Sequence, residues 1–487
     1  MNTTQAHAEE HICQQMRRRA FLNRSGIGLG SAALGSLFGA DASRAWGQES
    51  PSGMVAGLPG LPHLPPRVKR VIFLCMAGGP SHLETFDYKP KLEEISGQPM
   101  PESYTAGQPI AQLQGQELRA QGPLTKFRQY GEGGLYISDY FPWHAKMANE
   151  ICVIKSLQTE QINHDPAHTF MNTGTALSGR PSMGSWITYG LGVETNQLPG
   201  FVVMTSVGGR NPQPIASRQW SAGFLPSKFQ GVEFNSTGDP VNYVSPPRGV
   251  PLPQQQQIIE AIGTLDRHRL EQVRNPELET RISAYEMAFK MQMSVPDLMD
   301  VSDEPKHVLE MYGATPGDGS YASNCLLARR LAERGVRFIH LYHRGWDHHG
   351  GLEKYMQICS DLTDRPTYAL VTDLKQRGML DDTLIIWGGE FGRTPMFQGK
   401  GGVGRDHHIK GFSMWMAGGG IRGGTSYGNT DELGYYAVEN PVHVRDLHAT
   451  MLHLLGIDHT RFSYPYQGLD SRLTGVLPSR VVKEIIA

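Results

Sequence analysis

Six short runs of continuous apolar residues recur along the chain, separated by stretches with helical periodicity. A strand in which every residue is apolar is typical of a sheet covered by helices on both faces, whereas alternation is typical of a strand with one face in water. Strands that alternate with helices form doubly wound α/β layers. We therefore expect an α/β fold with a central, mostly parallel sheet flanked by helices, its strands lying at residues 71–76, 151–154, 201–204, 338–341, 384–387 and 412–416.

The helical patterns between these runs have recognisable ends. Residues 321–334 and 444–455 are each followed by a glycine, which readily adopts the left-handed conformation that ends a helix. A third pattern over residues 352–378 contains Pro366, which lacks the backbone N–H of the helical ladder, so we expect an interruption there. Residues 207–320 depart from the alternation, and their Gly-rich loops and polar helical patterns predict an insertion or lid.

The first 45 residues have the layout of a bacterial export signal. An arginine pair followed by x-Phe-Leu at residues 18–22 resembles the twin-arginine signal, and a weakly apolar stretch over 25–40 precedes small residues. A membrane-spanning helix is the alternative, but this stretch is short and Gly-rich for a hydrocarbon core of about 30 Å. We expect an exported, periplasmic or cell-surface protein that uses the twin-arginine export machinery, with a Pro-rich tether over 46–68.

Composition excludes several other classes. The formal net charge is −2, which argues against nucleic acid or an anionic membrane as the main partner. No later segment is long and apolar enough for a stable membrane span. Cys75 and Cys152 lie inside apolar runs, so buried thiols are expected in preference to disulfides or a nucleophilic cysteine.

Four clusters of polar residues directly follow predicted strands, where open α/β sheets bind their ligands. The first, residues 77–87, contains a Gly-Gly turn, and His82 and Asp87 are its candidate metal ligands or oxyanion contacts. The second, residues 163–168, begins a predicted helix whose N-terminus favours anions. A simple Asn or Asp helix cap is the alternative for this second cluster.

The other two clusters contain residues that suit a divalent cation. Asp347 and His349 are two positions apart, so on an extended segment they point to the same side. Any single His pair is more often a surface or hydrogen-bonded pair than a ligand pair, but repeated acids and imidazoles after buried strands favour a metal site. The fourth cluster, residues 388–393 together with 404–408, adds Glu390, Arg393, Asp406 and His407.

Seven segments together make the chain resemble a known family. It is identified as a member of the domain of unknown function 1501 family, an exported bacterial group, from about residue 69 to the C-terminus. This family is similar to sulfatases and alkaline phosphatases, which implies an alkaline-phosphatase-like sandwich over 69–487 with a metal site at the carboxyl ends of its strands. The segments are GGPSHLETFDYKP (78–90), NHDPAHTFMNTG (163–174), NPELETRISAYEMAF (275–289), GWDHHGG (345–351), GGEFGRTP (388–395), GRDHH (404–408) and DLHATMLHLLGI (446–457).

The resemblance to sulfatases departs from their pattern at the nucleophile. The sulfatase motif Cys-x-Pro-Ser-Arg, followed later by Thr-Gly, aligns with residues 164–174 and retains Pro166 and the Thr-Gly pair. His164 then occupies the nucleophile position, where a sulfatase needs Cys or Ser and a phosphatase Ser or Thr. Neither covalent mechanism carries over. The strand-end Asp-His of sulfatases falls on Glu390-Phe391, which keeps only the acid.

The hypothesis from the sequence is an exported metal-dependent hydrolase that acts on sulfate or phosphate esters of small molecules or polysaccharides. A water bound to a divalent ion (Ca, Zn, Mg or Mn) replaces the missing nucleophile. His164 positions or protonates the ester, and Arg393 or His168 binds its oxyanion. The alternative is a non-catalytic metal- or glycan-binding protein on the same fold. The expected metal ligands are Asp347, His349, Glu390, Asp406 and His407, completed by His82 and Asp87.

Replacing both Arg18 and Arg19 with Lys should leave unprocessed precursor in the cytoplasm, because the paired guanidinium groups form the recognised element of the signal. Cell fractionation and immunoblotting of the double variant measure this. Normal periplasmic delivery of the double variant would contradict the twin-arginine route and favour general secretion instead.

Overall fold

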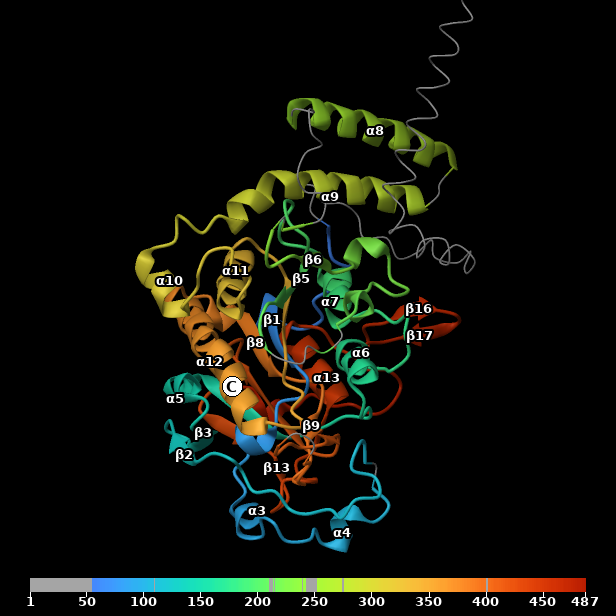
Figure 1. Ribbon diagram of the computed structural model, residues 1–487. Coiled ribbons are helices and arrows are strands. Elements are labelled where there is room, and N and C mark those ends of the chain that lie inside the picture. The colour runs from blue at the N-terminus through green and yellow to red at the C-terminus, as the bar shows by residue number, and fades with distance from the viewer. Residues whose placement is uncertain are drawn as a thin grey trace, which may run out of the picture. The chain divides into compact units, whose positions relative to one another are not determined.

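A nine-stranded, mostly parallel sheet lies at the centre of the computed structural model (Figure 1). The structure describes residues 55–108, 110–209, 213, 215–238, 240–241, 252–273, 276–399 and 402–487, so the predicted export signal lies outside the described residues. The strands, in spatial order, are β12 (Thr425–Tyr427), β4 (Ile151–Gln158), β11 (Phe412–Ala417), β8 (Thr383–Gly388), β1 (Arg70–Ala77), β7 (Phe338–Arg344), β5 (Phe201–Ser206) and β6 (Val232–Phe234), with β15 (Val442–His443) also paired to β4.

Each of the six predicted apolar runs forms a strand of this sheet, and the predicted mostly parallel α/β sheet flanked by helices is confirmed. The exception to the parallel arrangement is β11, which is antiparallel to both β4 and β8. Because these two antiparallel pairings follow one another, β4 again runs in the same direction as β8 and β1.

Alternate side chains of the central strands contribute to two separate cores. On β1, Ile72 and Leu74 pack in one core, whereas Val71 and Phe73 pack in the other. Helices therefore cover both faces, which explains why the strand sequences are apolar at every position (Figure 1). One layer contains α5 (Pro142–Lys146), α9 (Pro276–Met299), α10 (Lys306–Tyr312), α11 (Tyr321–Glu333) and α12 (Leu352–Gln376), and the other contains α6 (His164–Thr173), α7 (Met183–Leu191) and α13 (Val444–Leu454).

The interruption expected at Pro366 is wrong, because α12 continues through this residue. Proline removes one ladder hydrogen bond, at a cost of about 3 kcal/mol in a helix interior. Buried side chains on both sides of Pro366, including Met356 and Leu370, hold the helix against the core and offset that loss. Thr363 and Thr367 also donate their hydroxyls to backbone carbonyls of the helix.

The described part of residues 207–320 contributes the edge strand β6 and three α-helices, of which α8 (Leu252–Val273) packs on α9. Their role as a lid stays a prediction. Part of the predicted tether packs on the domain, since Leu58 N–H donates to Gly190 O and Arg67 N–H to Leu454 O. None of the helices within the described ranges combines the length and apolarity needed to cross a membrane.

Smaller elements lie in the loops outside the central sheet. In addition to α5, two short α-helices lie between β1 and β4, and four two-stranded antiparallel pairs lie outside the central sheet in the described part of the chain. They are α3 (Pro90–Glu94) and α4 (Glu102–Thr105), and β2 (Phe127–Tyr130) with β3 (Leu135–Ser138), β9 (Gly392–Arg393) with β10 (His407–His408), β13 (Asn429–Thr430) with β14 (Ala437–Glu439), and β16 (Tyr464–Tyr466) with β17 (Leu469–Ser471).

A buried ion pair joins two of these loops. Arg405 Nη2 lies 2.7 Å from Glu84 Oε1, and both side chains are fully buried. The remaining donors of Arg405 reach the carbonyl oxygens of Gln121, Gly122 and Thr394. The pair therefore fixes the loop that carries His407 against the turn that follows β1.

The variant E84Q should lower the free energy of unfolding by about 3 kcal/mol, because the neutral amide leaves a buried guanidinium without its counter-ion. The matched control is E94Q, whose carboxylate pairs with Lys91 at the exposed surface and should matter little. Urea denaturation of both variants measures the difference. Equal losses in the two variants would contradict a stabilising role for the buried pair.

Candidate metal centre

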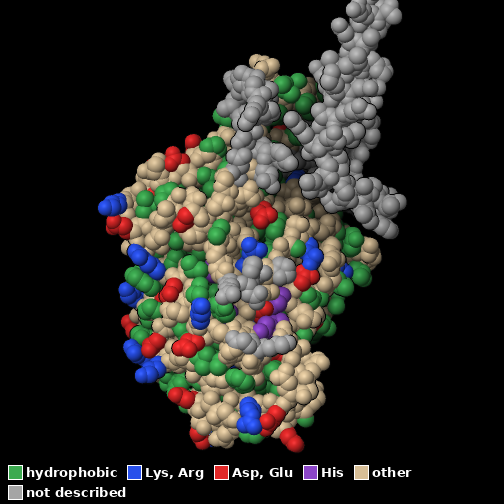
Figure 2. Space-filling view, viewed as in Figure 1, with side chains coloured by type: hydrophobic (Ala, Val, Ile, Leu, Met, Phe, Trp, Pro, Cys, Tyr) green, Lys and Arg blue, Asp and Glu red, His purple; other side chains and the backbone are tan. Residues whose placement is uncertain are grey.

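The carboxyl ends of β1, β4, β7 and β8 lie at one edge of the sheet, because these strands run in the same direction. Four side chains from the loops at this edge form a group whose ligand atoms all lie within 4.8 Å of one another. Figure 2 shows histidine side chains gathered at one place on the surface. The group consists of His164 at the start of α6, Asp347 and His349 after β7, and His407 in β10.

Each of the three imidazoles in this group has its Nδ1 atom beside an oxygen acceptor. A neutral imidazole carries one N–H, and the acceptor at Nδ1 fixes the proton there. The Nε2 atom of each ring is then a lone-pair donor available to a cation. The three pairs are His164 with Glu390 Oε1 at 2.6 Å, His349 with Gln398 Oε1 at 2.7 Å, and His407 with Ile162 O at 2.7 Å.

The three Nε2 atoms converge on the carboxylate of Asp347. His164 Nε2 lies 3.3 Å from Oδ2, and His349 Nε2 lies 2.9 Å from Oδ1. His407 Nε2 lies 3.3 Å from Oδ1 and only 2.9 Å from the Nε2 of His349. Two lone pairs that face each other at this distance repel, and a cation between them removes the repulsion. The donor set therefore fits a divalent metal ion.

Arg393 keeps Asp347 ionised. Burial by itself raises the pKa of Asp347, but the Arg393 charge, with Nη2 at 2.6 Å from Oδ1, lowers the pKa far below its usual range. Gln213 Nε2 donates to Oδ2 at 3.0 Å. The carboxylate thus stays negatively charged and held in one orientation.

The placement of Arg393 does not match the predicted oxyanion contact. Its side chain is 1% exposed, and its donors reach the carbonyl oxygens of Gly78, Gly79 and Arg405 as well as Asp347. A guanidinium with its donors engaged in this way has little left for a substrate. Its position favours a role in orienting Asp347 instead.

Glu390 and His168 lie behind the histidine group and not within it. Glu390 is fully buried and accepts hydrogen bonds from the Gly78 N–H at 3.0 Å and from His164 Nδ1. Burial raises the pKa of Glu390, but the neighbouring His168 and the hydrogen bond from His164 lower it to about 2. His168 is fully buried, and its Nε2 lies 3.4 Å from Glu390 Oε1. Glu390 therefore orients His164, and His168 does not reach the surface where an ester would bind.

Besides Glu390, three more of the predicted metal ligands do not join the group. His82 Nε2 lies 2.8 Å from Gly434 O, and Asp87 pairs with Lys89 at 3.0 Å. Asp406 accepts backbone N–H bonds from Gln112, Leu113 and His407. Their side chains turn toward neighbouring loops, so these residues fix the loops around the site. Conversely, His164 was predicted to act on the substrate, and its position among the ligand atoms favours a metal-ligand role.

Two further residues shape the site, Gln398, which carries no sequence signal, and Gly78, which belongs to the predicted Gly-Gly turn. Gln398 accepts from His349 and donates to Gln112 Oε1 at 3.1 Å, which sets the orientation of the imidazole. Only the folded loops show this contact. Gly78 is needed because its φ is +121° and a Cβ there would lie 2.5 Å from the Asp347 N. His348 points away, with Nε2 at 2.9 Å from Gly345 O.

Comparisons with known proteins show the family of the chain. The family described as "Protein of unknown function (DUF1501)" matches residues 68–486. No curated protein sequence matches the chain significantly. Solved structures similar to it include sulfatases and members of the alkaline phosphatase superfamily.

Three of these structures illustrate how distant the likeness is. A protein of the alkaline phosphatase superfamily from Vibrio parahaemolyticus is 10% identical, with a TM-score of 0.36, and 90% of this chain and 76% of that chain are covered. The PsFucS1 sulfatase from Pseudoalteromonas sp. is 13% identical, with a TM-score of 0.32 and coverage of 80% and 68%. The phosphonate monoester hydrolase SpPMH from Silicibacter pomeroyi is 11% identical, with a TM-score of 0.30 and coverage of 71% and 71%.

Replacing Asp347 with Asn, or His164, His349 or His407 with Ala, should each weaken zinc or manganese retention at least about tenfold, because each removes a ligand atom. His348→Thr should have little effect. H307A is the matched control, since His307 is exposed on α10. Equilibrium dialysis with elemental analysis measures the affinity. Retention of full affinity by H164A would restore a purely catalytic role for His164.

Proposed function

We propose that this chain, which belongs to the DUF1501 family, is a metal-dependent hydrolase of sulfate or phosphate esters. The convergence of three lone-pair Nε2 atoms on one ionised carboxylate is the observation that carries this proposal. Three imidazoles and one carboxylate suit Zn²⁺ or Mn²⁺ better than Ca²⁺ or Mg²⁺, which prefer oxygen ligands. A bound divalent ion would polarise the ester and lower the pKa of water.

The chain's own residues prepare the site for that chemistry. Glu390, Gln398 and the Ile162 carbonyl hold the three rings in the tautomer that presents Nε2. Arg393 keeps Asp347 charged and in place. Because these contacts are made before substrate arrives, little reorganisation is needed during the reaction.

The charge of the site supports an anionic substrate. The two carboxylates of Asp347 and Glu390 face the positive charge of Arg393 together with that of a divalent ion. The positive charges are in excess, so the site attracts sulfate or phosphate groups more than neutral esters.

The described residues offer little support for a covalent nucleophile. Cys75 lies in β1 with no exposed surface, and burial followed by the charge of Glu390 raises the pKa of its thiol well above normal. Thr169 and Thr173 in α6 donate their hydroxyls to backbone carbonyls of the helix. Water is therefore the nucleophile in this proposal. Export through the twin-arginine route, predicted from residues 18–22, belongs to the same proposal.

The test is turnover of four chromogenic or simple esters: 4-nitrophenyl sulfate, 4-nitrophenyl phosphate, bis(4-nitrophenyl) phosphate and a phenylphosphonate ester. Each is assayed with zinc, manganese, magnesium and calcium. At least one ester should be hydrolysed, and H349A should lower kcat/KM at least about 100-fold, because it removes both a ligand and the Gln398 contact. H307A should match the unaltered protein. No turnover with any metal would favour the non-catalytic binding protein.

A further inference from the structure

A second feature lies at the same sheet edge as the metal group: a pocket of about 480 Å³. The carboxyl ends of β5 and β7 form its base, since Thr205, Ser206 and Arg344 line it. The 3-10 turn η3 (Ser217–Trp220) and the edge strand β6 complete the walls. The volume is in the range typical of small-molecule sites.

Two connections show that this pocket adjoins the metal group. Arg344 precedes Asp347 by three residues, so their Cα atoms are separated by at most about 11 Å. On the other side, Arg218 of η3 forms an ion pair with Asp165, the neighbour of His164 in α6. The pocket is therefore close enough to take the remaining atoms of a substrate whose anionic group lies at the metal group.

The pocket presents a hydrogen-bond donor and an acceptor that do not pair with each other. Arg344 Nε is buried and has no hydrogen-bond partner among the described residues. Glu233 of β6 lines the same pocket, where loss of water raises the pKa of its carboxyl and the Arg344 charge acts in the opposite direction. Ser206 donates its hydroxyl to Tyr342 O and keeps oxygen lone pairs for a ligand.

We propose that this pocket binds the alcohol portion of the ester as a hydroxyl-rich group, a polyol or sugar ring. Arg344 donates to one ring oxygen or hydroxyl, and Glu233 accepts from another. A second anionic group is disfavoured, because the Glu233 carboxylate repels it. The hydroxyls of Thr205, Ser206 and Ser217 suit a polar ligand in the same way. This inference rests on the proposed ester hydrolysis, in which the anionic group of the ester binds at the adjacent metal group.

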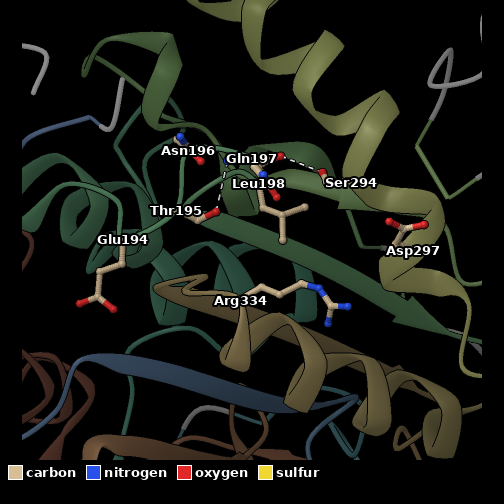
Figure 3. Close-up of a pocket in the computed structure, with 8 residues that line it drawn as sticks. All are labelled: Glu194, Thr195, Asn196, Gln197, Leu198, Ser294, Asp297 and Arg334. Atoms are coloured by element: carbon tan, nitrogen blue, oxygen red, sulfur yellow. Dashed lines mark hydrogen bonds between the residues drawn. The ribbon is translucent and has the colours of Figure 1, made fainter. Parts of the chain in front are cut away.

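A pocket at the opposite edge of the sheet provides a matched control. It has about 500 Å³ and is lined by Glu194 and Arg334 among others (Figure 3). Its lining residues precede β5 and β7, whereas the proposed subsite follows these strands. Ser294 closes part of it by donating to Gln197 O at 3.0 Å (Figure 3). The variant R334M therefore makes the same chemical change far from the metal group.

The kinetic test compares sugar esters with aryl esters in R344M, E233A, R334M and the unaltered protein. The substrates are galactose 6-sulfate and glucose 6-phosphate against 4-nitrophenyl sulfate and 4-nitrophenyl phosphate. R344M and E233A should each lower kcat/KM for a sugar ester at least about tenfold, because each loses a charged hydrogen bond. Aryl ester turnover and metal content should change less than about twofold, and R334M should change nothing. Equal effects on both ester classes would overturn the subsite.

A binding measurement separates this inference from the proposed function. Saturation-transfer NMR with free galactose, glucose, fucose and N-acetylglucosamine requires no turnover. Binding that is lost in R344M and kept in R334M supports the subsite even if no ester is hydrolysed, in which case the hydrolase proposal alone fails. Sugars at about 10 mM reveal even a weak, millimolar affinity. If none of the four sugars binds at that concentration, the subsite is overturned whether or not esters are hydrolysed.

Discussion

The contact between the Asp347 carboxylate and its cationic and imidazole neighbours is the constraint on which the rest of the site depends. One side chain, 10% exposed, lies within 3.3 Å of nitrogen atoms from three imidazoles and within 2.6 Å of the Arg393 guanidinium. An ionised carboxylate with so little exposure is costly unless such partners surround it. The loops after β4, β7 and β8, and β10, must all be in place before that requirement is met.

Much of the fold follows from local sequence, because strands that are apolar at every position are fully buried when helices cover both faces of the sheet. Alternate residues of β1 pack in the two cores, as that arrangement requires. The failure at Pro366 shows the limit of local reasoning. The cost of a proline in a helix is a local property of the sequence. Whether the helix continues depends on the packing of Met356 and Leu370 against residues distant in sequence.

The candidate site was predictable in part for a different reason. Strand-end position brings residues to one edge, and it correctly indicated that loops after β4, β7 and β8 meet. It does not say which way a side chain turns within its loop. His82 and Asp406 form hydrogen bonds with backbone groups of other loops, whereas His164 joins the group. Gln398 and the Ile162 carbonyl fix tautomers through contacts that only the folded chain reveals.

The most direct test of the central claim is anomalous X-ray diffraction from crystals of the full chain grown with zinc and measured on both sides of the zinc absorption edge. The structure predicts one strong anomalous peak about 2.0–2.2 Å from the Nε2 atoms of His164, His349 and His407 and from a carboxylate oxygen of Asp347. A peak at His82, Asp87 or Asp406, or no peak at the four-residue group under saturating zinc, would contradict the claim.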